Sequence, residues 1–220
     1  MASGGANHRR ERPISSVDAK AGGHASVAAI YAIAAWSGFY VMLVELLGGR
    51  LIAPFFGSSI YVWGSVIFVF MFGLSLGYLF GGLYSKHATL PKLCMLLALA
   101  ALSSLPIVFF GDPLLNVLFD ALPDPRAGSL ASCLALYLIP SIFSGMVSPV
   151  AIRLLIGDQS SSGQRAGFLY FASTVGSSVG TLLTSFYLVL WFEVNTIILA
   201  GVAVSLTLGL VCVLLNRRRA

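Results

Sequence analysis

Six long apolar stretches dominate the chain, and short polar segments separate them. Each stretch is long enough to cross about 30 Å of hydrocarbon as a helix. Because unpaired backbone amides and carbonyls are costly in lipid, each stretch is predicted to form a continuous or locally broken transmembrane helix. The predicted spans are Val27–Leu47, Ser59–Leu83, Leu93–Phe110, Leu130–Ile156, Gly167–Trp191 and Thr196–Leu215.

The apolar pattern repeats once along the chain. A gapless shift of 103 positions aligns Arg50-Leu51 with Arg153-Leu154, Ser58-Ser59 with Ser161-Ser162, Gly64 with Gly167, Gly73 with Gly176, Ser75 with Ser178, Gly77 with Gly180, Leu79 with Leu182, and Tyr84 with Tyr187. Each unit holds three spans, and three is odd, so the second unit must cross the membrane in the opposite direction. The sequence therefore predicts an all-α integral membrane protein built from two inverted three-helix repeats, residues 27–110 and 130–215, with its functional site at the repeat interface.

Composition and charge agree with a membrane class and orient the chain. The 220 residues are 58% hydrophobic and only 10% charged, which excludes an ordinary soluble domain. With six spans, eleven of the thirteen basic residues fall on the side that holds both termini, and only Arg50 and Arg126 fall on the other. By the positive-inside rule both termini are cytoplasmic, and we expect a location in a bacterial inner membrane. The net charge of +5 is thus a topology signal, and no nucleic-acid partner is expected.

The segments between the spans are predicted to be polar tails and loops. Residues 1–26 are expected to form a disordered cytoplasmic tail, and residues 216–220 a short basic cytoplasmic tail. The longest connection, residues 111–129, is expected on the outer side. Within it, Pro113 and the apolar face of residues 114–122 predict a short amphipathic helix on the membrane surface.

Small residues recur every four positions in two spans. Gly73, Gly77 and Gly81 form one ladder, and Gly176, Gly180 and Thr184 form its counterpart in the second repeat. Small residues at this spacing let another backbone come close, so ordinary helix packing is one interpretation. A second interpretation is that these two helices cross near the pseudo-twofold axis and slide or rock there.

Three charged residues near or inside the spans are candidates for ligand or proton handling. Glu45 lies within the first span, where an unpaired charge costs roughly 2.5–3.5 kcal/mol on the insertion scale, so it should face protein or water. It either binds a ligand or proton or pairs with a buried group; pairing with Arg50 would need a helix break at Gly48-Gly49. Arg50 and Arg153 would lie at opposite membrane faces, either reaching the headgroups or contacting anions.

Polar and aromatic side chains in the fourth and fifth spans complete the candidate set. Pro140 and Pro149 are predicted to kink the fourth span, with Ser141, Ser144, Gly145 and Ser148 between them. The fifth span adds hydroxyls that extend this polar seam, although some of them can bond their own helix. The additional candidates for ligand or proton handling are Trp63, Ser148, Tyr170 and Ser173, of which Trp63 can also serve as an interfacial anchor.

Two segments carry a family resemblance. The segment Glu45–Gly64, with the glycine ladder that follows it, resembles the membrane domain of spermidine synthase-like proteins. The segment Gly145–Leu154, followed by Gly167–Thr181, is similar to the second signature of that family. The family fuses a major-facilitator-like membrane part to an aminopropyltransferase-like soluble part, and the resemblance covers roughly residues 30–215 of this chain. No glycine-rich donor-binding turn is visible in residues 1–220, so we do not expect aminopropyl transfer from this chain.

The sequence therefore predicts a six-helix module that resembles half of a major-facilitator transporter and handles a small ligand with a partner. The expected partners are the lipid bilayer and either a second copy or another membrane or soluble subunit. The alternative is a non-transporting subunit that anchors a larger complex. An enzyme is the least favoured hypothesis, because no metal cluster, nucleophile–base pair or cofactor motif is visible; we expect no metal, no cofactor and no catalytic residue.

Overall fold

A computed structural model describes residues 16–156 and 162–217, which are helical apart from short connections. The helices are α1 (Ser16–Phe56), α2 (Ile60–Tyr84), η1 (Ser85–His87), α3 (Leu90–Leu102), α4 (Leu105–Ala121), α5 (Pro125–Leu155), α6 (Ser162–Leu183), η3 (Thr184–Leu188), α7 (Val189–Trp191) and α8 (Val194–Arg217). Six of the resulting segments are long and apolar enough to cross a membrane, which is the architecture of an integral membrane protein.

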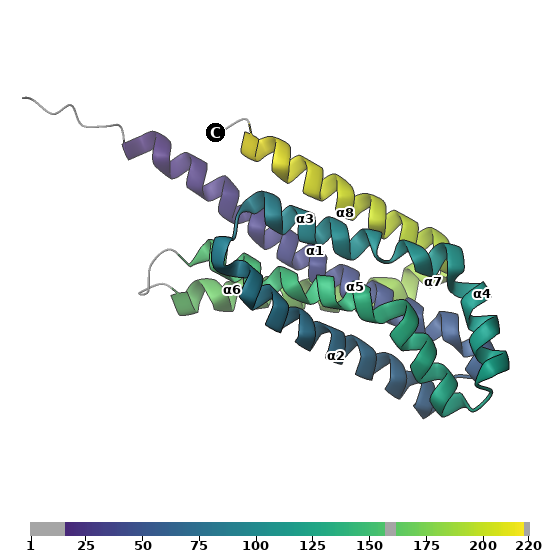
Figure 1. The fold of residues 1–220 in the computed structure, drawn as a ribbon. Coiled ribbons are helices and arrows are strands. Elements are labelled where there is room, and N and C mark those ends of the chain that lie inside the picture. The colour runs from purple at the N-terminus through teal and green to yellow at the C-terminus, as the bar shows by residue number, and fades with distance from the viewer. Residues whose placement is uncertain (1–15, 157–161, 218–220) are drawn as a thin grey trace, which may run out of the picture.

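The helices form an elongated bundle in which three pairings dominate. Helix α2 packs along α5, α1 packs along α6, and α3 packs along α8. The beginning of α1 and the end of α8 lie at the same end of the bundle (Figure 1). This placement is consistent with six passes of the chain along one axis.

Helix α1 differs from the prediction at its start and in its middle. Its first turn begins at Ser16, so residues 16–26, expected in a disordered tail, are helical; residues 1–15 lie outside the described part of the chain. No break occurs at Gly48-Gly49, because these two glycines serve packing. A Cβ at Gly48 would lie 3.1 Å from the ring of Tyr137, and one at Gly49 would lie 2.7 Å from the ring of Trp63.

The turn from α1 to α2 is shorter than the expected loop. Pro54 lies inside α1, which continues to Phe56. Gly57 then reverses the chain with a φ of +81°, a backbone conformation that suits glycine because it has no Cβ. Residues 157–161, between α5 and α6, lie outside the described ranges.

The third span includes the segment that was predicted to be a separate surface helix. Helices α3 and α4 meet at a turn around Ser103 and Ser104, and α4 runs without interruption through Pro113 to Ala121. Of the predicted apolar face, Leu115 is fully buried against the bundle, whereas Phe119 and Leu122 are exposed. The prediction of an independent helix over Pro113–Leu122 was therefore wrong. Proline at position 113 removed one backbone donor without ending the helix.

The fourth and fifth spans contain local irregularities. Helix α5 passes through both Pro140 and Pro149 and changes direction along its length (Figure 1). The fifth span changes from α6 to the π-helical turn η3 at Thr184, a residue whose side chain is fully buried. π-helical turns inside α-helices insert one extra residue and are frequent near functional sites.

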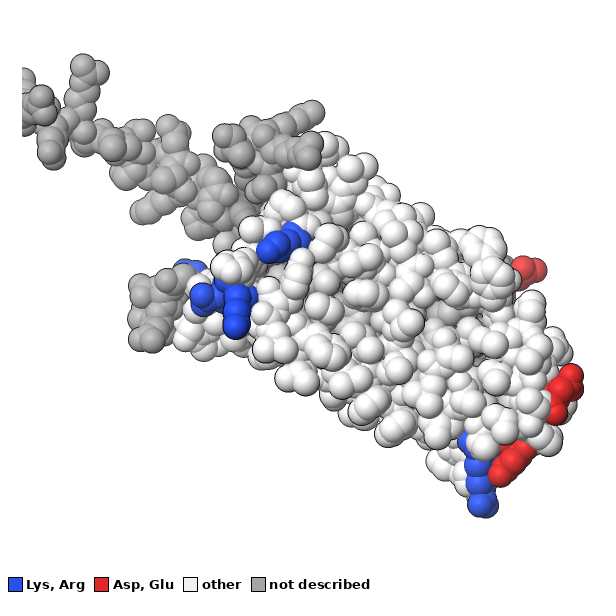
Figure 2. All heavy atoms as spheres, in the orientation of Figure 1, with Lys and Arg blue, Asp and Glu red and all other residues white. Residues whose placement is uncertain are grey.

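Charged side chains gather at the two ends of the bundle, and the described surface between them carries no Lys, Arg, Asp or Glu on the face shown in Figure 2. One end, where α2 and α5 finish, carries Lys86, Lys92, Arg153 and Arg165. The opposite end carries Asp112, Asp120, Asp124, Glu193, Arg50 and Arg126. We call these the basic end and the acidic end.

Candidate functional site: a hydroxyl-lined groove between α1, α2, α5 and α6

The glycines of α2 bring its backbone into contact with α5. A Cβ at Gly73 would lie 2.6 Å from the Cβ of Ser141 and 3.3 Å from the carbonyl oxygen of Leu138. A Cβ at Gly81 would lie 2.7 Å from the Cα of Met146. Between them, Gly77 faces the Ile142 carbonyl and the backbone of Gly145. Any larger side chain here would force the two helices apart.

The glycines of α6 make equivalent contacts with α1. Gly176 faces the backbone of Ala35, and a Cβ at Gly180 would lie 2.7 Å from the carbonyl oxygen of Phe39. Adding 103 to Ala35 and Phe39 reaches Leu138 and Ile142, which are the residues that Gly73 and Gly77 meet in α5. The two principal helix contacts therefore use equivalent positions under the sequence offset.

These contacts correct one interpretation of the glycine ladders. Helices α2 and α6 were considered as a pair that crosses near a central axis. Instead, α2 packs chiefly on α5 and α6 packs chiefly on α1. The ladders fasten each of these helices to a different neighbour, and a groove remains between the two pairs.

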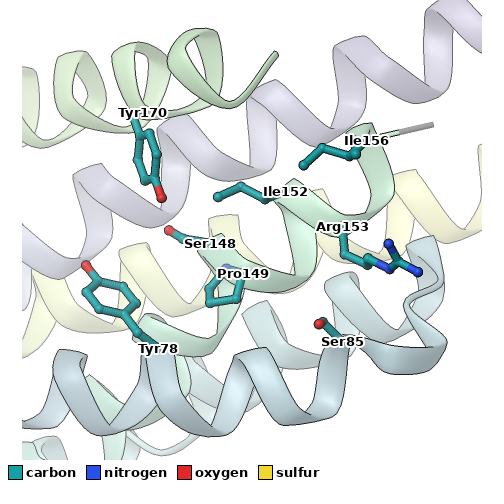
Figure 3. A pocket seen from close by; sticks show the side chains of 8 residues that line it. All are labelled: Tyr78, Ser85, Ser148, Pro149, Ile152, Arg153, Ile156 and Tyr170. Atoms are coloured by element: carbon teal, nitrogen blue, oxygen red, sulfur yellow. The ribbon is translucent and has the colours of Figure 1, made fainter. Parts of the chain in front are cut away.

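The larger cavity in this groove has a volume of about 490 Å³ and reaches the basic end. Figure 3 shows Tyr78 of α2 and Tyr170 of α6 on opposite sides of Ser148 of α5, with the three hydroxyls pointing toward a common space. Arg153 and Ser85 line the other end of the same cavity (Figure 3). Its remaining lining residues are Pro149, Ile152 and Ile156.

A second cavity of about 270 Å³ continues from the first toward the middle of the bundle. The two share Tyr78, Ser148 and Tyr170. The second cavity is the more polar, because all four helices contribute hydroxyl groups to it. Besides the shared Tyr78 of α2, Ser148 and Tyr170, these are Ser37 of α1, Ser144 of α5, and Ser173, Thr174 and Ser177 of α6.

The groups lining the larger cavity have hydrogen-bonding capacity to spare. Within the described ranges, no hydrogen bond occupies the hydroxyl of Tyr78, Ser148 or Tyr170, and no ion pair occupies Arg153. A hydroxyl both donates and accepts, whereas the guanidinium only donates. The cavity therefore offers a small ligand three hydroxyls, two aromatic rings and one positive charge.

The structure brings together some of the predicted site residues and separates others. Ser148, Arg153 and Tyr170 line the larger cavity, and Ser173 lines the adjoining one. Trp63 lies toward the acidic end, against Gly49, and lines neither cavity.

The two charged residues of α1 also lie away from the cavities. Arg50 is exposed near the end of α1. Glu45 is half-buried, and among the described residues no hydrogen bond or ion pair reaches it. Neither residue lines the groove. Because α1 does not break, the Glu45–Arg50 pair that a broken helix would permit does not form.

Tyr78 and Ser37 were not singled out from the sequence, although both line the groove. Tyr78 directly follows Gly77 of the ladder, so a tyrosine in mid-span next to a close helix contact was the available signal. Ser37 precedes Gly38, whose Cβ would lie 2.8 Å from the hydroxyl of Ser177. Which side chains such isolated polar residues meet depends on which helix packs opposite them, and the sequence does not show that.

Comparisons with known proteins yield no match: no family model, no curated protein and no solved structure is similar to this chain at a significant level. Within residues 16–156 and 162–217, no three His, Cys, Asp or Glu side chains lie close enough to hold a metal ion.

Proposed function

We propose that this chain is a membrane module that binds a small polar ligand in the groove and moves it across the bilayer together with a partner. The observation that carries the proposal is the convergence of the Tyr78, Ser148 and Tyr170 hydroxyls in a cavity open at the basic end. Tyr78 and Tyr170 are exposed along this groove, and hydroxyls that face lipid without a hydrogen-bond partner are costly unless water or a ligand satisfies them. A ligand path accounts for them.

The lining residues favour a ligand that carries a negatively charged or strongly accepting group. Among the described residues, Arg153 is the one charged side chain that lines the larger cavity, and none lines the smaller, so a carboxylate or phosphate on the ligand would find its counter-charge at Arg153. Among the residues that the structure describes, a polyamine would meet Arg153 and no carboxylate in these cavities. The substrate of the enzymes that the chain's motifs resemble is for that reason a poorer fit to this site than an anion.

The proposed path is open at one end and closed at the other. Beyond Leu74 and Val41, the buried cluster of Val44, Leu47 and Phe70 fills the bundle toward the acidic end. Movement across the membrane would require the helix pairs to tilt against each other, as inverted repeats do. The equivalent contacts of Gly73 with Leu138 and of Gly176 with Ala35 support such a repeat of residues 27–110 and 130–215, resembling half of a major-facilitator transporter.

We further propose that a partner covers the open side of the groove. The span that contains α6 is the least buried of the six, yet it carries Ser173, Thr174 and Ser177. Lipid cannot satisfy hydroxyls, so a second copy of the chain or another subunit is the fitting cover. The chain would lie in the membrane with its basic end and both termini in the cytoplasm, as expected for a bacterial inner membrane protein.

A non-transporting structural subunit is the second candidate, and one observation favours it. Large apolar side chains of the fifth span are exposed, including Phe168 and Phe171 of α6 and Phe186 of η3. Aromatic side chains are enriched where one protein packs on another. In this hypothesis the groove is only a contact surface for a neighbouring subunit.

Uptake into proteoliposomes tests the leading proposal. The purified chain is reconstituted, and uptake of radiolabelled succinate, phosphate and spermidine is measured as representatives of anions and polyamines. We expect an anion to be taken up, and Tyr170→Phe, Ser148→Ala and Arg153→Gln each to weaken its binding roughly ten-fold, the loss expected for one strong hydrogen bond.

Ser178→Ala is the matched control. Ser178 is an exposed serine of the same helix as Tyr170, and its hydroxyl donates to the Thr174 carbonyl at 3.0 Å. This variant should transport like the parent. If none of the three probes crosses, and a stoichiometric protein copurifies with the chain from native membranes, the structural-subunit hypothesis replaces the transporter.

A further inference from the structure

A second groove lies between α2 and α5 near the acidic end, away from the proposed ligand path. Its volume is about 390 Å³, and its lining residues are Tyr61, Gly64, Ser65, Phe68, Arg126 and Leu130. Gly64 creates the space, since a Cβ there would meet no atom within 4 Å. From Tyr61 to Phe68 the groove follows about 10 Å of helix, given a rise of about 1.5 Å per residue.

One end of this groove carries an oriented cation. The guanidinium of Arg126 lies 4.7 Å from the centre of the Tyr61 ring and donates to the Tyr61 hydroxyl at 3.1 Å. A guanidinium has five N–H donors, so this single bond leaves most of them available. The nearby Asp124 carboxylate accepts from the backbone N–H of Arg126 at 3.0 Å, and no ion pair joins its carboxylate to the guanidinium among the described residues.

The deeper part of the groove offers a ligand only apolar contacts. Phe68 and Leu130 provide hydrocarbon, and Phe68 stacks on Phe72 with ring centres 5.7 Å apart. The one polar side chain on the floor, Ser65, is already satisfied: its hydroxyl bonds the Tyr61 carbonyl at 2.9 Å and the Ser129 hydroxyl at 3.0 Å. Water in this part of the groove would find few groups with which to form hydrogen bonds.

We propose that this groove binds a phospholipid, with the lipid phosphate on Arg126 and Tyr61 and an acyl chain along Gly64 and Phe68. The polar end lies where α2 and α5 begin, at the level of the other charged residues, and the apolar part extends into the span. A phospholipid has the same division between an anionic group and hydrocarbon at the membrane boundary. Arginine forms paired hydrogen bonds to phosphate, which distinguishes this site from general lipid contact.

Native mass spectrometry of the full chain tests the proposal. The chain is purified in dodecyl maltoside and mixed with dioleoylphosphatidylglycerol, with dioleoylglycerol, which has the same chains without phosphate, or with inorganic phosphate. The phospholipid should stay bound, dioleoylglycerol should not, and inorganic phosphate should not displace the lipid. Equal retention of dioleoylglycerol, or displacement by inorganic phosphate, would overturn the proposal, because the first needs no cation and the second needs no acyl chain.

Two variants address the two halves of the groove. Arg126→Gln removes the charge, and Gly64→Phe fills the apolar part without touching Arg126; each should weaken phospholipid retention roughly ten-fold. Gly82→Phe and Arg50→Gln are the matched controls, because Gly82 is another α2 glycine with open space and Arg50 is another exposed cation of the acidic end.

The controls should retain the lipid as the parent does. Unchanged retention in Arg126→Gln contradicts the site whatever Gly64→Phe does. Because Arg126 is exposed, its substitution leaves the packing intact and remains informative even if Gly64→Phe does not assemble. None of these residues lines the proposed ligand path, so failure here leaves the transport proposal standing.

Discussion

Gly180 of α6 lies directly against the backbone of Phe39 in α1, where an added Cβ would come within 2.7 Å of the Phe39 carbonyl oxygen. In α2, Gly77 makes the same kind of contact with Ile142 of α5. At both places a glycine is required by the closeness of two backbones. The sides of the groove are held at these two points.

Gly180→Leu and Gly77→Leu should therefore each destabilise the bundle. Backbone cannot move aside as a side chain can, so overpacking should cost at least about 1–3 kcal/mol. The midpoint of thermal unfolding in detergent should fall, together with the yield of monodisperse protein.

The chain offers matched controls for this pair. Gly82 in α2 and Gly167 in α6 have no atom within 4 Å of an added Cβ. Gly82→Leu and Gly167→Leu should keep the parental unfolding midpoint. The close-contact interpretation fails if all four leucine variants unfold alike.

The orientation of the chain can be tested by labelling single cysteines in intact cells. Ser58 at the acidic end and His87 at the basic end are both exposed. An impermeant maleimide should label Ser58→Cys from outside and label His87→Cys only after the membrane is permeabilised, because the basic end should be cytoplasmic.

The native cysteines provide the background for that experiment. Cys94, Cys133 and Cys212 are buried and free, so they should react slowly in the parent chain. Labelling of His87→Cys in intact cells, with Ser58→Cys protected, would reverse the proposed orientation.

Glu45 is expected to be dispensable for the groove. Since no hydrogen bond or ion pair within the described ranges compensates its charge, Glu45→Gln should leave the chain as stable as the parent or more stable. Thermal unfolding in detergent measures the effect on stability, and a ligand-binding assay measures the effect on the groove. A clear loss of stability would reveal a compensating group, and a loss of binding with normal folding would place Glu45 on the ligand path.

A side-chain hydrogen bond adds to the apolar packing between α1 and α8. The indole N–H of Trp36 donates to the hydroxyl of Ser205 at 2.8 Å, and that buried hydroxyl in turn donates to the Gly201 carbonyl at 2.8 Å. Ser205→Ala leaves the indole without its acceptor and should cost about 1–2 kcal/mol of stability.

Thr207→Ala is the comparison for this variant. Thr207 is exposed on the same helix and bonds only the Ala203 carbonyl, at 2.7 Å. Its removal should change the unfolding midpoint little. Equal effects of the two substitutions would mean that the Trp36 bond contributes nothing measurable to the packing of α8.

The sequence by itself was sufficient for the membrane class and for the number and approximate positions of the six spans. Those features depend on the length of apolar runs and on backbone satisfaction in lipid, and both are local properties. The small-residue ladder around Gly77 was also visible, because its spacing places the glycines on one helix face. The partner helix was not visible, since spacing marks a face without saying what lies opposite.

Tertiary structure decided where helices end and which polar groups meet. Gly48 and Gly49 read locally as a break, yet α1 continues because the rings of Tyr137 and Trp63 occupy the space that the glycines leave. Pro113 read as a helix start, yet it lies inside α4, which the bundle contacts through the buried Ile107 and Leu115 on either side of that proline.

The groove too is a product of tertiary packing and not of local sequence. Ser148, Tyr170 and Tyr78 come from three different helices and share one cavity only because α5 lies between α2 and α6. Glu45 stood out locally because a charge in an apolar span is rare, but its helix face does not reach that cavity. Rarity is a property of the chain, whereas proximity depends on how the helices pack.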